Sequence, residues 1–220
     1  MSSVADPDVP YTKFVETLCK PGGVLLSELT GDKAHLWHMA SGLCGEAAEL
    51  LLCIREYQKG QITPAAAREN VIEELGDIQF YDTGISNAAE FAVQLSASQR
   101  EAIFMAITER GLTDDSDAFR GMSTETDAGI QTLLEVAADV VVAAGMLFDI
   151  IKQYTVYNKE LNREAVEVER LALRNATGAV RMLWWSSSSE IEAYNRKKLA
   201  KRYWQLVYSN EHAQERADKA

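Results

Sequence analysis

Residues 42–57 read GLCGEAAELLLCIREY, and residues 69–81 read ENVIEELGDIQFY. Each stretch places two acids three positions apart, Glu46 and Glu49 in the first and Glu74 and Asp77 in the second. Side chains at this spacing share one face of a helix. If two such helices pack antiparallel, the four carboxylates meet at one place in the core. These two stretches therefore predict a helical core built around an acidic cluster.

Helix signals continue on both sides of these stretches. The sequence predicts a long helix over 32–57, with Asp32 as its N-cap and Gly60 as its stop. Thr63-Pro64 predicts the start of a second helix, which runs through the eighties and bends at Gly84. Further helices are expected over 11–19, 98–110, 125–158, 162–184 and 190–208, with residues 20–23 stopping the first of them. No stretch shows sustained alternation of period two, so the expected fold class is all-α.

The composition excludes several classes of function. The chain has 220 residues, 47% of them hydrophobic and 25% charged, with a net charge of −11, so a nucleic-acid-binding surface is not expected. No apolar run approaches the ~20 residues that cross a bilayer, and residues 1–10 lack the apolar segment of a secretory signal. The three cysteines form no C-x-x-C pair and indicate reduced thiols. We therefore expect a cytoplasmic protein with no membrane and no nucleic-acid partner.

A comparison of the two halves indicates a diverged tandem repeat. Residues 47–57 align with 144–154, and after a two-residue deletion residues 68–71 align with 163–166. Two unrelated helical segments of similar composition can also give a match of this quality. The expected organisation is an N-terminal half over 1–110, a linker over 111–124 and a degenerate second half over 125–220, packed together as a pseudo-dimer.

The acidic cluster predicts a metal site. Four carboxylates cannot all remain ionised in a low dielectric without a cation, and Mg²⁺ is the ion that carboxylate oxygens suit best. The alternative is that these are solvated glutamates on exposed helix faces, as most E-x-x-E pairs are. The apolar residues around Glu46 and Glu49, including the run Leu50 to Leu52, argue against that alternative.

Here the sequence resembles a known family. The segments GLCGEAAEL at 42–50 and ENVIEELGDIQFY at 69–81 resemble the two signature segments of the MazG-like, all-α nucleoside triphosphate pyrophosphohydrolases. NRKKLAKRY at 195–203 resembles the N-x-x-K-L-x-x-R-Y helix of that family, and HLWHMASGL at 35–43 also fits. The resemblance covers the beginning and the end of the chain but not the middle. It implies Mg²⁺-dependent hydrolysis of an NTP or dNTP to the monophosphate and pyrophosphate, with Mn²⁺ as a substitute ion.

The resemblance also implies roles for individual residues. It assigns the metal ligands and the acids of the catalytic site to Glu46, Glu49, Glu74 and Asp77. Glu73 would help to order a ligand or a water, and Asn195 and Lys198 would contact phosphate.

Helical spacing adds three candidates for the substrate site. Arg202 lies one turn beyond Lys198 and is a second candidate for the phosphates. Tyr81 lies one turn beyond Asp77 and is a candidate for the sugar or phosphate. His38 lies on the same helix face as Glu49. It can either contact the base of the substrate or be a histidine of the core, and the sequence favours neither role.

The sequence departs from the family pattern in a complementary way. Asp77 and Asn195 are 118 positions apart, although the corresponding motifs of the family lie much closer together. In the second half, the alignment places Ala143 and Met146 opposite Glu46 and Glu49, and Ala172 opposite Asp77; only Glu169, opposite Glu74, is retained.

We therefore expect one composite active site per chain, with the metal held by the first half and phosphate held by the second. The expected partner is a small nucleotide substrate, and the chain is expected to be a homodimer or a pseudo-dimeric monomer. The alternative is a catalytically inactive nucleotide-binding or structural protein on the same scaffold.

Overall fold

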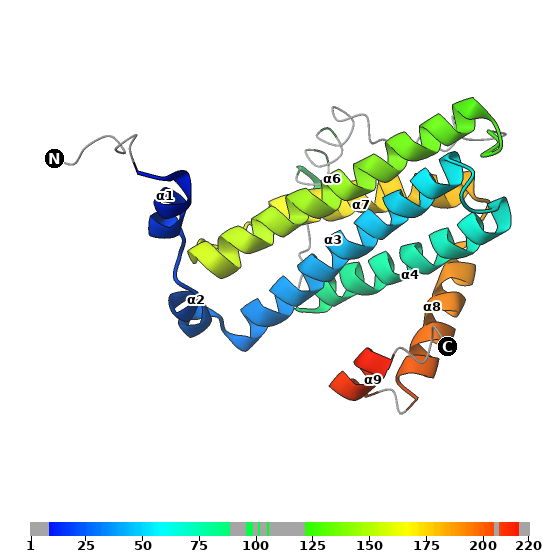
Figure 1. Ribbon diagram of the computed structural model, residues 1–220. Coiled ribbons are helices and arrows are strands. Elements are labelled where there is room, and N and C mark those ends of the chain that lie inside the picture. Colours follow the sequence, from blue (N-terminus) through cyan, green and yellow to red (C-terminus); the bar gives the residue numbers. More distant parts are fainter. Residues whose placement is uncertain are drawn as a thin grey trace.

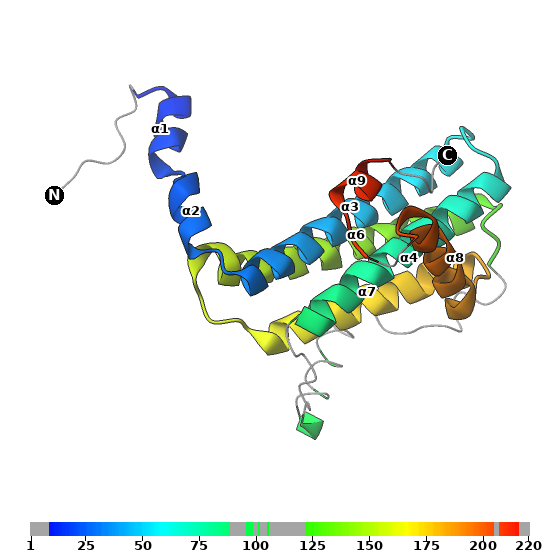
Figure 2. The same ribbon diagram turned by 90° about the horizontal axis from the view of Figure 1, so that it is seen from below.

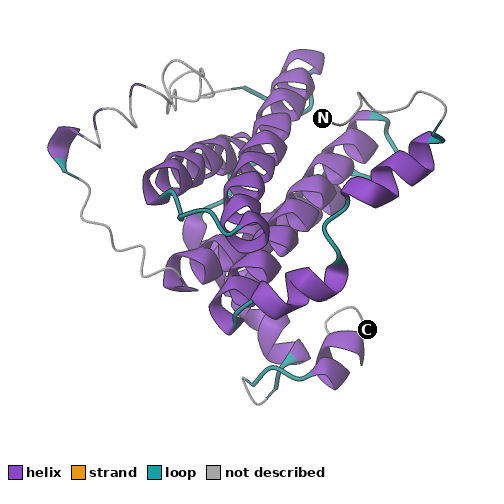
Figure 3. Ribbon diagram, turned by 90° about the vertical axis from the view of Figure 1, so that its left-hand side faces the viewer, coloured by secondary structure: helices purple, strands orange, loops and turns teal. Residues whose placement is uncertain are grey.

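The computed structural model describes residues 9–88, 96–98, 101, 105, 122–204 and 207–215. Within these residues the protein is all-α and contains no strand, as predicted (Figures 1 and 3). None of the described helices is long and apolar enough to cross a membrane. The helices are α1 (Tyr11–Leu18), α2 (Gly22–Glu28), α3 (Gly31–Gln58), α4 (Pro64–Ala88), α6 (Asp127–Tyr157), α7 (Arg163–Leu183), α8 (Ser188–Arg202) and α9 (Asn210–Glu215).

The two helices that carry the acidic cluster begin at side-chain caps. Thr30, rather than the predicted Asp32, caps α3 by accepting a hydrogen bond from the backbone N–H of Lys33. The prediction for α4 is confirmed: Thr63 accepts from the backbone N–H of Ala66 at 3.2 Å, directly before Pro64. Between the helices Gly60 has φ +68°, a backbone conformation that favours glycine at a helix stop.

The later helices also begin at side-chain caps. Thr126, Asn162 and Ser187 cap α6, α7 and α8, each accepting a backbone N–H three residues on. The expected span of 190–208 for the last of these was wrong. The helix begins earlier, at Ser188, because Ser187 provides the cap, and it ends at Arg202, where the N–H of Tyr203 donates to Leu199. Most of the helix expected over 98–110 and most of the linker expected over 111–124 lie outside the described residues.

The N-terminal helices stand apart from the rest of the protein (Figures 1 and 2). Residues 20–23 were expected only to stop a helix, but α2 begins at Gly22, directly after Pro21. Neither α1 nor α2 contains a buried residue. Lys20 lies between α1 and α2, and its ammonium donates a hydrogen bond to the backbone carbonyl of Val156. This bond connects the N-terminal helices to the end of α6.

The four long helices form an elongated bundle (Figure 1). Helix α3 packs against α4 and α6, and α6 packs against α7. Helices α4 and α7 also touch, but over a smaller contact, and α8 lies against α4. One continuous apolar core fills the bundle, and its largest fully buried members are Leu43, Leu50, Ile54, Ile85, Leu133, Leu147, Ile151, Leu173 and Leu183.

The two halves present the same pattern of buried positions to this core. Buried residues of α3 recur 97 positions later on α6, as in the pairs Leu36/Leu133, Ala40/Ala137, Leu43/Val140, Ala47/Ala144, Leu50/Leu147 and Ile54/Ile151. Buried residues of α4 recur 95 positions later on α7, as in Val71/Val166, Glu74/Glu169, Ile78/Leu173 and Ile85/Val180. These offsets are the ones that the sequence comparison used. Corresponding helices of the two halves therefore turn corresponding faces inward.

A buried ion network joins α4 to α7. The guanidinium of Arg170, which is 2% exposed, donates through Nε to Asp82 Oδ1 at 2.6 Å. Arg174 donates to the other oxygen of Asp82 at 3.1 Å, and Glu167 accepts from Arg170 at 2.7 Å. Burial acts to lower the pKa of Arg170, but its hydrogen bond to Asp82 and the nearby carboxylates outweigh burial and raise it. Arg170 and Arg174 therefore balance the charges of Asp82 and Glu167, and these four side chains together carry no net charge.

Because α3 and α6 share one core, we predict that the two halves unfold together. Truncation of either buried counterpart, by Leu50→Ala or Leu147→Ala, should lower the free energy of unfolding by about 2–5 kcal/mol within one cooperative transition. Urea denaturation followed by circular dichroism measures this. Leu52→Ala is the control, since Leu52 is 56% exposed and its loss should change stability by less than about 0.5 kcal/mol. Two separate transitions, only one of them shifted by each substitution, would contradict the prediction.

Candidate metal and phosphate site

The predicted acidic cluster forms where α3 crosses α4. Glu46, Glu74 and Asp77 each bring one carboxylate oxygen to within 4.8 Å of the others. Small residues permit the close crossing: a Cβ on Gly42 would lie 2.3 Å from the ring of Tyr81, and a Cβ on Gly84 would lie 2.3 Å from the sulfur of Met39. Helix α4 runs unbroken through Gly84, the residue at which the sequence suggested a bend. The role of Gly84 is close packing.

Helix α8 covers the acidic cluster from the side of α4. Asn195 donates through Nδ2 to Asp77 Oδ1 at 2.7 Å. The ammonium of Lys198 pairs with Asp77 Oδ2 and, at 3.2 Å, with Glu73 Oε1. Both α8 side chains are buried. The two halves of the chain therefore meet at Asp77, as the composite-site hypothesis requires.

A glycine that sequence reasoning passed over makes this contact possible. A Cβ on Gly76 would lie 2.9 Å from Cβ and 3.2 Å from Nδ2 of Asn195. Any larger residue would therefore push α8 away from α4. The available signal was the glycine directly before Asp77, since an interior glycine costs a helix roughly 1 kcal/mol and normally has a packing reason.

The electrostatics of the cluster show how poorly it tolerates negative charge. Burial, followed by the proximity of Glu46, Glu49 and Glu73, raises the pKa of Glu74 to about 8. Burial and the charge of Asp77 also raise the pKa of Glu46. The pKa of Lys198 is raised as well, and for a lysine this favours the charged form. Burial acts to lower this pKa, but the carboxylates of Asp77 and Glu73 outweigh burial. The site therefore favours bound positive charge, and Lys198 supplies part of it.

The donor set fits a hard divalent cation. The cluster offers only carboxylate oxygens, the ligands that Mg²⁺ prefers, and leaves further positions for water and phosphate. Glu46, Glu74 and Asp77 would hold the ion.

The remaining predicted residues surround this centre at different depths. Glu49 is exposed and lies outside the group of three, yet it is close enough to raise the pKa of both Glu46 and Glu74. Tyr81 is half-buried; burial raises its pKa first, and the charges of Glu46 and Asp77 raise it further while Arg202 opposes them. His38 is exposed, and its ring lies 6.2 Å from that of Tyr81, so it is not a core histidine.

The corresponding place in the second half cannot repeat this arrangement. At the aligned positions Ala143 and Ala172 are buried, and Met146 is exposed. Glu169, the retained acid, is 7% exposed. The second half thus offers one carboxylate where the first offers four, counting Glu49.

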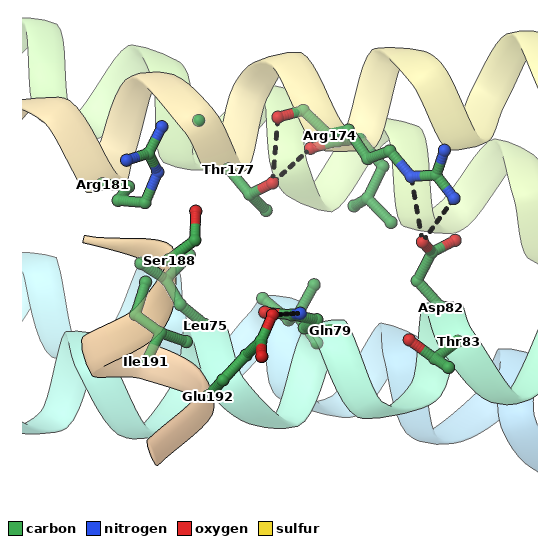
Figure 4. Close-up of a pocket in the computed structure, with 13 residues that line it drawn as sticks. Leu75, Gln79, Asp82, Thr83, Arg174, Thr177, Arg181, Ser188, Ile191 and Glu192 are labelled. Carbon is green, nitrogen blue, oxygen red and sulfur yellow. Dashed lines mark hydrogen bonds and ion pairs between the residues drawn. The ribbon is translucent and has the colours of Figure 1, made fainter. Parts of the chain in front are cut away.

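Two cavities flank α4 without reaching the carboxylates. One of about 410 Å³ lies between α4, α7 and α8, where Arg174 meets Asp82 and Arg181 faces the start of α8 (Figure 4). The other, of about 600 Å³, is lined by residues such as Phe80, Asn87 and Asn195. Neither is lined by Glu46, Glu74 or Asp77, because Lys198 and Asn195 occupy the space beside Asp77.

Comparisons of the chain with protein-family models, with curated proteins and with solved structures gave no match.

The raised pKa of Glu74 predicts that the metal-free protein loses stability as the pH rises. Its carboxyl ionises near 4.5 when unperturbed but keeps its proton to about 8 in the folded protein. The folded state therefore binds more protons across this window, and stability falls as the pH increases through it. Glu74→Gln should flatten the decline and raise stability at alkaline pH by on the order of 2 kcal/mol, or about 4–8 °C, allowing for partial solvent screening. Thermal unfolding in EDTA between about pH 5 and 8.5 measures this, and an unchanged slope would contradict it.

The Gly76 contact predicts opposite effects for two glycine substitutions. Gly76→Ala should destabilise the protein by about 1–3 kcal/mol, since the new methyl group collides with Asn195. Gly45→Ala is the matched control on α3, because nothing lies within 4 Å of its Cβ position. It should be neutral or stabilising by up to about 1 kcal/mol through helix propensity. Urea denaturation distinguishes them, and effects of the same sign would argue against close packing of α8.

Proposed function

We propose that the protein is a Mg²⁺-dependent pyrophosphohydrolase that converts an NTP or dNTP to the monophosphate and pyrophosphate. The observation that carries this proposal is the meeting of two kinds of group at Asp77. Carboxylates suited to a divalent cation come from α3 and α4, and a buried lysine and asparagine suited to phosphate come from α8. Phosphoryl transfer depends mainly on positioning and on neutralised charge, which is what this set of groups offers.

In this proposal each residue has a definite task. Glu46, Glu74 and Asp77 would hold Mg²⁺, or Mn²⁺ in its place, and the exposed Glu49 would complete the set from the solvent side. The ion would supply positive charge that offsets the charge of the phosphates. A ligand carboxylate accepts the proton of the attacking water. Lys198 exchanges its contact with Asp77 for the substrate phosphates, while its contact with Glu73 holds the lysine within reach. Asn195 and Arg202 bind further phosphate oxygens, while Tyr81 and His38 face the sugar or base.

We also propose that the chain is a fused pseudo-dimer of the MazG-like kind, with one site. The matching burial register of α3 with α6 and of α4 with α7 supports a common origin of the halves. The loss of carboxylates from the second half supports a single metal centre. Such a chain completes its site without a second copy, so a monomer is competent.

One observation favours the non-catalytic alternative. Lys198 and Asn195 both bind Asp77, so α8 can serve simply to neutralise a half-buried acid. A structural protein on this scaffold would release no pyrophosphate from any nucleotide. A panel of NTPs and dNTPs with Mg²⁺ or Mn²⁺, analysed by chromatography, separates the two readings.

Substitutions at Asp77 and Lys198 test the composite site. Asp77→Asn should abolish Mg²⁺-dependent release of pyrophosphate, because it removes a metal ligand. Lys198→Ala should lower kcat by about a hundredfold or more, by analogy with the loss of one preorganised electrostatic contact. Lys197→Ala is the matched control, since Lys197 is the exposed neighbour on the same helix.

The two substitutions test different parts of the proposal. Full activity of Lys198→Ala would refute the division of the site between the halves while leaving the metal assignment intact. Full activity of Asp77→Asn would refute the placement of the metal at Asp77, whereas the enzyme itself would be refuted by a wild-type protein that releases no pyrophosphate.

A further inference from the structure

The chain beyond α8 gathers aromatic side chains that the proposed reaction leaves without a role. The rings of Tyr203 and Tyr208 have centroids 5.7 Å apart, and His212 on α9 lies 6.5 Å from Tyr203 and 6.4 Å from Trp204. We call these residues the C-terminal aromatic group. Trp204 is 68% exposed and Tyr208 67% exposed, so two large aromatic faces are open to solvent.

The aromatic group lies in line with the metal and phosphate site. Lys198 pairs with Asp77, and Arg202 follows one turn later, about 6 Å further along α8. Arg202 and Tyr203 are both close enough to Tyr81 to influence its pKa. The chain then turns back through α9 on the side of the bundle on which α8 lies (Figures 1 and 2). From the carboxylates outward, the order is therefore metal ligands, cations and aromatic rings.

This order matches the polarity of a nucleotide, in which phosphates, sugar and base follow one another. We propose that the C-terminal aromatic group is the platform on which the base of the substrate stacks, with Trp204 and Tyr208 providing the faces. The inference rests on the proposed function and adds to it the residues that hold the base. Stacking uses the face that every base has, so the platform binds purines and pyrimidines alike.

A further observation concerns His212. Nδ1 of His212 is buried and has no hydrogen-bond partner among the described residues. Buried polar atoms are nearly always paired, and an unpaired one requires an explanation. A base bound beside Trp204 would bring polar edge atoms into this part of the molecule.

Charge disfavours a membrane as the occupant. Peripheral membrane binding through aromatic side chains is normally supported by a surplus of Lys and Arg. This chain has a net charge of −11, which opposes binding to an anionic membrane surface. A nucleotide brings its own anionic end to Lys198 and Arg202 and needs only an uncharged surface for its base.

The test compares a ligand that has a base with one that has none. Binding of an α,β-methylene nucleoside triphosphate, which cannot be cleaved at that bond, and of inorganic tripolyphosphate is measured by titration calorimetry with Mg²⁺. Trp204→Ala and Tyr208→Ala should each raise the Kd of the nucleotide by about five- to a hundredfold, the usual effect of losing one stacked aromatic. The Kd of tripolyphosphate should not change. Trp185→Ala is the matched control, because Trp185 is 75% exposed and lies before α8.

Each other outcome overturns the inference. Equal losses of affinity for both ligands would show that the aromatic residues have a structural role. No loss of affinity for either ligand would show that the base binds at another place. A wild-type protein that binds the nucleotide no more tightly than tripolyphosphate has no base platform. Failure of the proposed function is recognised separately, because wild-type protein would then release no pyrophosphate from any nucleotide whatever the binding results.

Discussion

Repulsion between carboxylates at the crossing of α3 and α4 is the constraint around which this protein is arranged. Three acids converge within 4.8 Å in a partly buried place, and a fourth, Glu49, adds its field from outside. Such a cluster persists only if some of the acids keep their protons or positive charge is brought to them. The structure shows both: the pKa of Glu74 is raised to about 8, and α8 supplies the ammonium of Lys198.

The two halves of the chain share one core but contribute different polar side chains to the site. Their buried positions correspond along α3 with α6 and along α4 with α7, so apolar packing is shared evenly. Polar chemistry is not shared: the first half keeps the acids, and the second half keeps the helix with Asn195 and Lys198. Asp82 and the arginines of α7 reinforce the contact between α4 and α7, where packing is thinner.

Much of this could be predicted from the sequence, where the determinants are local. Thr63-Pro64 and Asn162 fix helix starts through their own side chains, and the E-x-x-E and E-x-x-D spacings fix which face carries the acids. The failures have non-local causes. Thr30 and Asp32 are both residue types that cap helices, and the sequence does not show which of them accepts the hydrogen bond at the start of α3. Nothing near Gly76 in the sequence shows that Asn195 packs on it, and the second short helix after Pro21 carries no apolar face toward the core. Nor does the spacing reveal that Glu49 is exposed whereas Glu74 is buried.

The separation of 118 residues between Asp77 and Asn195 has a consequence for how the molecule is made. Contacts between distant parts of a chain form late, because the intervening loop must be closed first. During synthesis α3 and α4 leave the ribosome long before α8 exists, so the acids meet with no lysine to balance them. The contacts of Asp77 with Asn195 and Lys198 are therefore among the last that the growing chain can make.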